Sequence, residues 1–392
     1  MSDGTLQTLD VSMLEDVGTG ASQLVQLDSN AKIPACSAAA LTGVSTVTKS
    51  ASDPVVTTNP SGGVGTVWQN TTSGEMYICT DATAGANVWT NVGPGTGDIQ
   101  ITYGGSTYGF VSGGNTNMSS ARINNIQKFA FASNTTGTNL GDLTVVREGL
   151  AGASSLTDGY SIAGSAGGSF NTIDKFTFAN SNNAVDHGDV TVARYYPTGN
   201  NSTTHGFAAG GNSSSTVIDK FAFGSAANAV DHGDLAVGAQ SSTGLSSETH
   251  GFAAGGYISA NTNRIDKFAF ASNTTAVDHG NLSHADDGAA GASSITHGYV
   301  SGGGASGATQ VTIDKFAFAS NTTAADHGDL ALQIAQAVGS SSTTHGYCCG
   351  GYTGSPIAVT DTINKFAYAS NTTAADHGNL HTGVRWPAGH QV

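Results

Sequence analysis

The sequence predicts an all-β protein whose main part is a six-bladed β-propeller with four-stranded blades. A motif built on Lys-Phe occurs six times, its period is 45–50 residues, and Gly accounts for 54 of the 392 residues. A period of this length with about four short β-segments per repeat is typical of propeller blades. Helical repeats are disfavoured because this content of Gly and β-branched residues would be costly in helices.

Each repeat is predicted to contain four strands. The first resembles GASSIT at 291–296, the second GYVSGG at 298–303, the third TIDKFAFA at 312–319, and the fourth DHGDVTVAR at 186–194. In the third strand, alternation puts Ile, Lys and Ala on one face and Asp and both Phe residues on the other. We expect the Phe pair of one sheet to fill the hollow over the alanines of its neighbour.

A lysine in the third strand and an Asp-His pair in the fourth recur with the repeat. Because a lysine in a largely buried strand needs a partner, we expect the acids of the Asp-His-Gly-Asp segment to pair with it, for example Asp186 or Asp189 with Lys175. The histidines recur at equivalent places, which indicates repeated hydrogen bonding and not a catalytic centre. The structural repeat residues are Lys128, Lys175, Lys220, Lys267, Lys315, Lys365, Asp186, His187, Asp231, His232, Asp278, His279, Asp326, His327, Asp376 and His377.

A second set of histidines lies at the turn between the first and second strands: His205, His250, His297 and His345. If the first strand is innermost, these side chains ring the central opening, where a metal or an anion could bind. Two of the six repeats lack the histidine, and the ring is wider than tetrahedral zinc geometry. We therefore expect no metal and no cofactor.

The sequence contains no motif that predicts catalysis. Cys348 and Cys349 replace Val-Ser or Ala-Ala in the same strand of other repeats, so small strand filler is the expected role, and Cys36 and Cys79 complete no spaced framework. No Ser/His/Asp order, phosphate-binding Gly loop or HExxH appears. A non-enzymatic protein is expected.

The connections between strands fall into a uniform set and a variable set. Turns after the first and third strands are nearly constant, whereas connections after the second and fourth strands vary in length and chemistry. Because successive turns alternate between the two ends of a blade, one face is scaffold and the other is suited to recognition. The candidate receptor- or glycan-binding residues are Arg122, Phe170, Arg194, Tyr195, Tyr196, Tyr257, Arg264, His284, Asp286, Asp287 and Tyr352.

Charge and hydropathy exclude two classes of partner. The formal net charge is −15 with only 13 Lys and Arg residues, which disfavours nucleic-acid binding. No run of about 18 apolar residues is present for a membrane span. MSDGTLQT lacks the basic start and apolar core of a signal peptide.

The repeat resembles kelch-type blades, in which a strand ending in Gly-Gly precedes an outer strand and an Arg-bearing connection. Arg147, Arg194 and Arg385 match the last position. Either of two segments could complete the first blade and close the ring: DIQITYGGS at 98–106 or RWPAGHQV at the end of the sequence.

The region before residue 98 does not repeat. We expect an attachment and stalk segment at 1–60, a small β-hairpin module at 61–97 with an apolar cluster of Trp68, Tyr77 and Trp89, and the propeller at 98–392. LVQLDSNAKIPACSAAALTGV at 24–44 resembles a segment of bacteriophage tail-fibre and other virion adhesin proteins. GTVWQNTTSGEMYICTDATAGANVWTNVG at 65–93 resembles a module of marine phage, particularly cyanophage, structural proteins.

This resemblance implies a virion protein, most simply a tail fibre or receptor-binding adhesin with a propeller face directed at a host surface glycan or receptor. The thin N-terminal region is expected to gain a core by trimerising or by docking on other virion tail proteins. Two alternatives remain: a structural or decorating virion protein, and a propeller enzyme acting on polysaccharide with Asp286 and Asp287 as paired carboxylates.

Overall fold

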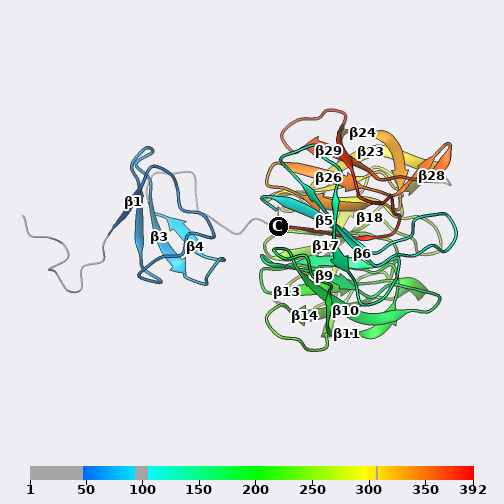
Figure 1. Cartoon of the computed structure of the whole chain (residues 1–392), viewed down its shortest axis with the longest axis horizontal. Coiled ribbons are helices and arrows are strands. Elements are labelled where there is room, and N and C mark those ends of the chain that lie inside the picture. The colour runs from blue at the N-terminus through cyan, green and yellow to red at the C-terminus, as the bar shows by residue number, and fades with distance from the viewer. Residues whose placement is uncertain (1–46, 93–104, 306–307) are drawn as a thin grey trace, which may run out of the picture. The chain divides into compact units, whose positions relative to one another are not determined.

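The computed structural model describes residues 47–92, 105–305 and 308–392, in two compact units that fall within residues 1–100 and 101–392. Each unit is considered by itself (Figure 1). In these ranges every regular element is a β-strand except one 3₁₀ turn at Asn212–Ser214. The predicted all-β class is therefore confirmed. No helix in the described ranges has the length and apolar character needed to cross a membrane.

The smaller unit is one four-stranded sheet. β1 (Thr48–Ser50) runs parallel to β2 (Val67–Asn70), and β3 (Met76–Asp81) and β4 (Val88–Asn91) follow antiparallel. Tyr77, Cys79 and Trp89 are fully buried, with Trp68 edge-on to Trp89 at 5.8 Å between ring centroids. The predicted aromatic cluster is confirmed, and the sheet begins at Thr48, before the expected boundary at 61.

The larger unit consists of six antiparallel sheets, numbered I to VI, with four equivalent strands in each. The first strands of sheets I to VI are β31 (Ala388–Gln391), β8 (Ala151–Ser154), β12 (Thr198–Asn201), β16 (Thr243–Ser246), β20 (Ala290–Ser293) and β25 (Val338–Ser341). The second strands are β5 (Tyr108–Ser112), β9 (Asp158–Ile162), β13 (His205–Ala209), β17 (His250–Ala254), β21 (His297–Ser301) and β26 (His345–Cys349).

The third strands are β6 (Asn125–Ala130), β10 (Phe170–Thr177), β14 (Val217–Ala222), β18 (Arg264–Ala269), β23 (Ala308–Ala317) and β29 (Thr362–Ala367). The fourth strands are β7 (Thr138–Asp142), β11 (Val185–Arg194), β15 (Val230–Asp234), β19 (Val277–Asn281), β24 (Ala325–Ala335) and β30 (Ala375–Asn379). Three short strands, β22 (Gly304–Ala305), β27 (Tyr352–Gly354) and β28 (Ile357–Val359), extend sheet V. Four-stranded antiparallel sheets of this kind are consistent with propeller blades.

Sheet I is built from both ends of the unit. β31 pairs antiparallel with β5, in the register Ala388 to Ser112 and Gln391 to Gly109. Of the two segments expected to complete the first blade, RWPAGHQV therefore supplies the strand, whereas 98–104 lies outside the described residues. The first strands of the six sheets contact one another in the order β31, β8, β12, β16, β20, β25, and β25 also contacts β31.

Apolar side chains pack between consecutive sheets in six equivalent clusters, one of which joins sheets VI and I. Asp and Phe of the third strand share one face, as predicted, and the structure directs that face toward the preceding sheet. The partner of the Phe pair differs from the prediction: it is an aromatic ring of the second strand, not a hollow over alanines. Phe223 stacks on Tyr160 at 4.7 Å, and the equivalent rings of the other interfaces stack at 4.6–4.7 Å.

The Asp-His-Gly histidines join neighbouring sheets. The Nε2 of His187 lies 2.9 Å from the carbonyl oxygen of Ala222 in the next sheet, and His232, His279, His327 and His377 repeat this bond at the same distance. Since a carbonyl only accepts, each Nε2 carries the proton. The imidazole ring also packs edge-on against an aromatic ring, as His187 does with Tyr160 at 5.0 Å. These histidines therefore have the repeated hydrogen-bonding role that the sequence indicates.

The expected partners of the repeated lysines are wrong. Lys175 pairs with Asp158 of the second strand at 3.3 Å, and not with Asp186 or Asp189. Asp186 instead accepts a hydrogen bond from the N–H of Gly188 in its own turn at 2.9 Å. The reason is geometric, because the acid is held by the positive-φ glycine beside it and the lysine leans over the second strand.

Two buried ion pairs also cross between sheets. Arg147 Nη2 lies 3.0 Å from Asp174 Oδ2, and Arg194 Nη2 lies 2.6 Å from Asp219 Oδ2, with all four side chains at most 2% exposed. The match of Arg385 to this position is wrong by one residue, because buried Val384 occupies it. At that interface Thr382 N–H donates to Gln127, as Thr144 N–H donates to Asp174 elsewhere.

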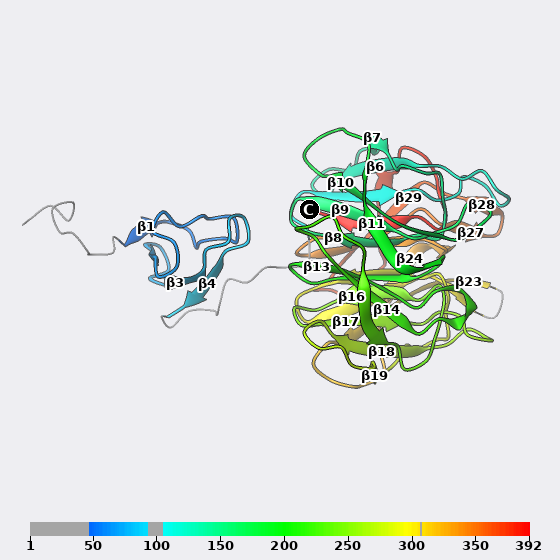
Figure 2. The same ribbon diagram turned by 90° about the horizontal axis from the view of Figure 1, so that it is seen from below.

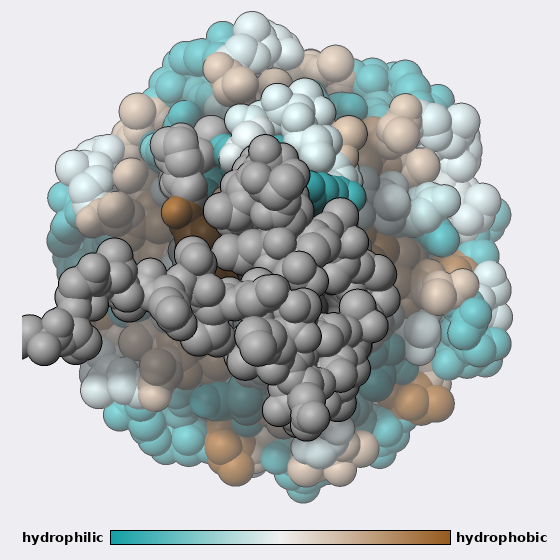
Figure 3. Space-filling view, turned by 90° about the vertical axis from the view of Figure 1, so that its left-hand side faces the viewer, coloured by the Kyte–Doolittle hydropathy of each residue, from teal (hydrophilic) through white to brown (hydrophobic). Residues whose placement is uncertain are grey.

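The uniform and variable connections lie at opposite ends of the larger unit. The antiparallel order of each sheet places turns after first and third strands at one end, with the C-terminus, which we call the uniform end. Connections after second and fourth strands, including β27 and β28, gather at the other end, the variable end (Figures 1 and 2). On the side that contains the uniform end, hydrophilic and weakly hydrophobic residues are interspersed around the rim (Figure 3).

Candidate functional site

Six residues at the variable end form a closed cycle of backbone hydrogen bonds, which we call the central ring. They are Gly149, Tyr196, Ser241, Gly288, Gln336 and Trp386, each just ahead of a first strand and each with φ between 54° and 67°. The N–H of each donates to the carbonyl of the member before it, at 2.7–3.0 Å, and Gly149 N–H donates to Trp386 to close the cycle. This cycle ties together the connections of all six sheets.

The floor beneath the central ring consists of one glycine from each first strand. A Cβ on Gly244 would lie 1.8 Å from the carbonyl oxygen of Gly199, and one on Gly339 would lie 1.8 Å from that of Gly291. Only glycine permits the first strands to approach this closely. The result is a small pocket of about 110 Å³ between floor and ring, which has room for part of a small molecule such as the edge of one sugar ring.

Two aromatic side chains line this pocket, Tyr196 and Trp386, whose ring centroids are 4.4 Å apart. Tyr195 packs edge-on against Tyr196 at 5.0 Å, and we call the three residues the aromatic platform. A Cβ on Gly149 would lie 2.6 Å from the Tyr196 ring, and one on Gly288 would lie 2.8 Å from Trp386 Cη2. Trp386 therefore reaches from the sheet VI connection to that of sheet IV.

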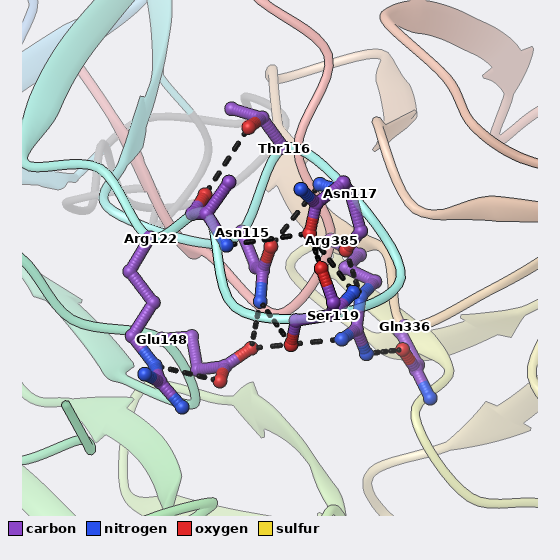
Figure 4. Close-up of polar contacts among 9 residues, drawn as sticks. Asn115, Thr116, Asn117, Ser119, Arg122, Glu148, Gln336 and Arg385 are labelled. Atoms are coloured by element: carbon purple, nitrogen blue, oxygen red, sulfur yellow. Dashed lines mark hydrogen bonds and ion pairs between the residues drawn. The ribbon is translucent and has the colours of Figure 1, made fainter. Parts of the chain in front are cut away.

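A polar cluster adjoins the platform (Figure 4). Glu148 Oε1 accepts from Arg122 Nε at 2.8 Å, and its Oε2 accepts from buried Asn115 Nδ2 at 3.0 Å. Arg385 lies 3.9 Å from the same carboxylate and donates to Gln336 Oε1 at 2.8 Å. One acid thus links side chains of two other connections, the one after β5 and the one after β30.

Burial and the nearby Glu148 charge raise the pKa of Tyr196 to about 12. The Tyr196 hydroxyl therefore stays protonated at neutral pH and remains able to donate a hydrogen bond to a ligand.

Next to sheets IV and V, the rim around the aromatic platform is made of polar side chains. Asn261 Nδ2 donates to Asp287 Oδ1 at 3.2 Å and to the carbonyl of Gly304. Tyr257 is 39% exposed, and the pKa of Tyr352 is raised first by burial and then by the charge of Asp287. The rim thus offers phenol and carboxylate groups around the apolar platform.

The structure divides the eleven predicted binding residues into five groups. Tyr195 and Tyr196 form the platform, and Arg122 belongs to the polar cluster. Tyr257, Asp287 and Tyr352 lie on other connections of the variable end. Arg194 and Asp286 are buried, at 2% and 4% exposed, so neither side chain is available to a ligand. Of the eleven, Tyr196 alone lines the pocket, and Phe170, Arg264 and His284 belong neither to the platform nor to the polar cluster.

Sequence reasoning missed Trp386, Glu148, Gln336 and Arg385 as candidates. A signal for Trp386 was present, because Trp386-Pro387 and Tyr196-Pro197 are the same aromatic-Pro pair at equivalent points of two repeats. Glu148, Gln336 and Arg385 carry no such signal, since their cluster depends on connections distant in sequence.

Comparisons with known proteins identify no family for this chain. No protein-family model matches the chain, and no curated protein matches it.

The described residues contain no group of three or more His, Cys, Asp or Glu side chains that could hold a metal ion. His205, His250, His297 and His345 do not ring the central opening as expected. Toward the uniform end, the central opening is lined by Ser, Asn and Gln side chains of the first strands. Each of the four histidines instead has its Nδ1 2.8 Å from the hydroxyl of the threonine before it. Cys348 and Cys349 are buried free thiols in β26, with pKa values raised by burial.

Asp286 occupies the position that Arg147 and Arg194 hold in sheets I and II, so an acid faces the third-strand acid of the next sheet, Asp314. Burial, opposed by His284 and reinforced by the charges of Asp314 and Asp287, raises the pKa of Asp286 to about 6. Burial also raises the pKa of Asp314, whose carboxylate accepts from the N–H of Ser283 at 2.8 Å.

Asp286→Asn is expected to change how stability depends on pH. In the folded chain Asp286 binds its proton up to about pH 6, whereas in the unfolded chain it loses it near pH 4, so folding stability falls as pH rises through that interval. Asparagine mimics the protonated acid, and the stability of the variant should nearly equal that of wild type at pH 4 and exceed it by about 3 kcal/mol at pH 7. Urea unfolding at pH 4, 5, 6 and 7 measures this, and identical curves would contradict it.

Proposed function

We propose that the larger unit is a closed six-bladed β-propeller in which β31 completes the first blade. Three cycles support this proposal: the first strands contact one another in a circular order, the central ring returns to its starting residue, and an apolar cluster joins sheet VI to sheet I. A closed toroid removes free sheet edges between blades, which stabilises an array of short strands.

We propose further that the chain is a non-enzymatic virion protein, a tail fibre or receptor-binding adhesin, whose variable end binds a host surface glycan. The resemblance of 24–44 and 65–93 to phage tail-fibre segments supports the virion setting. In this proposal the N-terminal region, of which residues 1–46 lie outside the described part, attaches to other virion tail proteins and trimerises.

The aromatic platform is the observation that carries the binding proposal. Half-buried Tyr196 and Trp386 rings at the centre of a rigid backbone ring present flat apolar faces, and sugars pack their C–H faces on such rings. Arg122, Gln336 and Asp287 around them supply directional donors and acceptors for hydroxyl groups. A preorganised site of this kind loses little conformational entropy on binding.

A polysaccharide-cleaving enzyme is less well supported. Hydrolysis of a glycosidic bond requires two carboxyl groups that reach the substrate. Asp286, one of the two candidates, is 4% exposed, so its carboxyl group does not reach a substrate. We therefore propose recognition without cleavage.

Trp386→Gln and Tyr196→Ser test the binding proposal, because Gln336 and Ser241 already occupy the equivalent ring positions with the same φ. Each variant should keep its thermal unfolding temperature within a few degrees and lose at least about tenfold in affinity for host cells or their isolated glycans. Val192→Thr, at an exposed position of β11 outside both proposed binding surfaces, is the control.

Retention of full host binding by both variants would overturn the glycan site at the platform. Absence of any host binding by wild type would instead favour the alternative of a structural or decorating protein. Release of reducing sugar from host polysaccharide would favour the enzyme.

A further inference from the structure

A second kind of pocket lies at the uniform end, between neighbouring sheets. The pocket between sheets IV and V is lined by His250, Lys267, Asp278, His279 and Asn321. Sheet III supplies His205 and Lys220 at the equivalent positions, sheet V supplies His297 and Lys315, and sheet VI supplies His345 and Lys365. The same set of side chains therefore recurs four times around this end.

The lysine of each pocket has a positive charge that the described residues do not pair with an acid. Among the six repeated lysines, an ion pair within 4 Å is present for Lys175 alone. Lys267 Nζ donates one long hydrogen bond, of 3.3 Å, to the carbonyl of Phe318 in the next sheet, and lies 5.7 Å from the ring centroid of Phe252. A half-buried ammonium with three donors keeps unused capacity for an anion.

In sheet II, the chain itself provides an acid next to the repeated lysine. Asp158 stands where four of the other five repeats have histidine, and its Oδ2 lies 3.3 Å from Lys175 Nζ. Thr157 and Thr177 hydroxyls donate to the same carboxylate at 2.8 and 3.0 Å. One repeat thus has a carboxylate paired with the lysine, whereas four repeats have a histidine at that position.

The other groups of the pocket indicate the class of ligand. Asp278 Oδ1 accepts a hydrogen bond from Gly280 N–H at 2.8 Å, and Asp278 Oδ2 lies 3.4 Å from Arg264 Nη1. These contacts neutralise only part of the negative charge of Asp278, so the pocket disfavours a multiply charged phosphate or sulfate. Asp278 and the Asn321 amide accept hydrogen bonds from hydroxyls, and Val277 beside them is 61% exposed, offering an apolar surface to a sugar ring. A singly charged sugar acid matches ammonium, acceptors and apolar surface together.

We propose that the four pockets of sheets III to VI each bind the carboxylate of one uronate residue, and that the uniform end is a multivalent surface for an acidic polysaccharide. The lysine ammonium pairs with the carboxylate, and the fourth-strand aspartate and the asparagine of the neighbouring turn accept from the hydroxyls. Four equivalent sites on one rigid end raise the avidity for a repeating polymer beyond that of one site. This surface lies at the end opposite the aromatic platform and does not depend on the function proposed there.

The test uses the full chain and galacturonate oligosaccharides, with neutral dextran oligosaccharides and polyglutamate as controls. Calorimetric titration should give four sites per chain for galacturonate and no binding of dextran. His205→Asp, His250→Asp, His297→Asp and His345→Asp combined copy sheet II into the other pockets, and should lower affinity at least tenfold with the fold retained. Asp158→His should raise the number of sites from four to five. Trp386→Gln should change neither value.

Unchanged galacturonate binding by the combined variant, or an unchanged number of sites in Asp158→His, would overturn the proposal. So would equal binding of dextran, which would remove the role of the carboxylate, or equal binding of polyglutamate, which would remove the role of the sugar hydroxyls. If the combined variant unfolds, Lys220→Gln, Lys267→Gln, Lys315→Gln and Lys365→Gln combined replaces it, with Lys175→Gln as the matched change that should leave binding intact.

Discussion

Deletion of residues 388–392 is expected to abolish cooperative folding of the larger unit. These residues form β31, the first strand of sheet I, and His390 within it is fully buried, with Nε2 3.0 Å from Ser112 Oγ and Nδ1 3.1 Å from the carbonyl of Ala153. Loss of the strand exposes the edge of β5 and opens the cycle of sheets between VI and I. The cost should exceed about 5 kcal/mol, comparable with the whole stability of many domains.

The deletion can be rescued by moving the strand. Val392 N–H donates to Tyr108 at 2.9 Å, as Ser155 N–H donates to Asp158 in sheet II, so Val392 joined directly to Ser106 would recreate the three-residue turn of the other sheets. A rearranged chain that begins at residue 386, runs to Val392 and continues from Ser106 to Arg385 should unfold cooperatively at a temperature near that of wild type. Circular dichroism and calorimetry follow both proteins, and a stably folded deletion variant would contradict the expectation.

Arg147→Val is expected to lower the free energy of unfolding by about 3–5 kcal/mol, because it leaves the buried carboxylate of Asp174 without its counter-charge. Thr144 hydroxyl and N–H bonds to that carboxylate, at 2.7 and 3.0 Å, remain but do not replace the guanidinium. Chemical denaturation of wild type and variant at neutral pH measures the loss.

The double variant Arg147→Val with Asp174→Gln is the matched control for this prediction. It copies the interface of sheets VI and I, where buried Val384 and Gln127 occupy the same two positions. Since a neutral, packed pair can replace a buried ion pair at little cost, the double variant should regain most of the lost stability. An equal loss in single and double variants would show that the ion pair is not the source of the effect.

The candidate sites differ in how far the repeat sequence predicts them. The residues of the uniform end recur with the repeat, so the sequence of one repeat predicts the positions of Lys267, His279 and Asp278 in its third and fourth strands. Their contacts could not, because the acid expected to pair with the lysine is held by a local turn glycine, and the lysine instead reaches a carbonyl of the next sheet.

The variable end shows the opposite balance. Variation among its connections correctly predicted that Tyr195, Tyr196 and Arg122 lie at this end. Arg194 and Asp286 are not binding candidates, because their side chains are buried between sheets. Trp386 and Tyr196 meet only because backbone hydrogen bonds bring six connections into one ring. Exposure and ring geometry depend on contacts between different repeats, such as that of Trp386 with Tyr196, which periodicity does not encode.

The sequence alone determined the all-β class, the strand order within each repeat, and the alternation that directs Asp and Phe of the third strand to one neighbour. These properties are local, because strand alternation and turn chemistry act over a few residues. The tertiary structure alone decided that β31 joins β5, that Phe rings stack on aromatic rings and not on alanines, and which polar side chains are buried. Those outcomes depend on the close approach of six separate sheets, where glycine contacts, ion pairs and ring stacking are made between repeats.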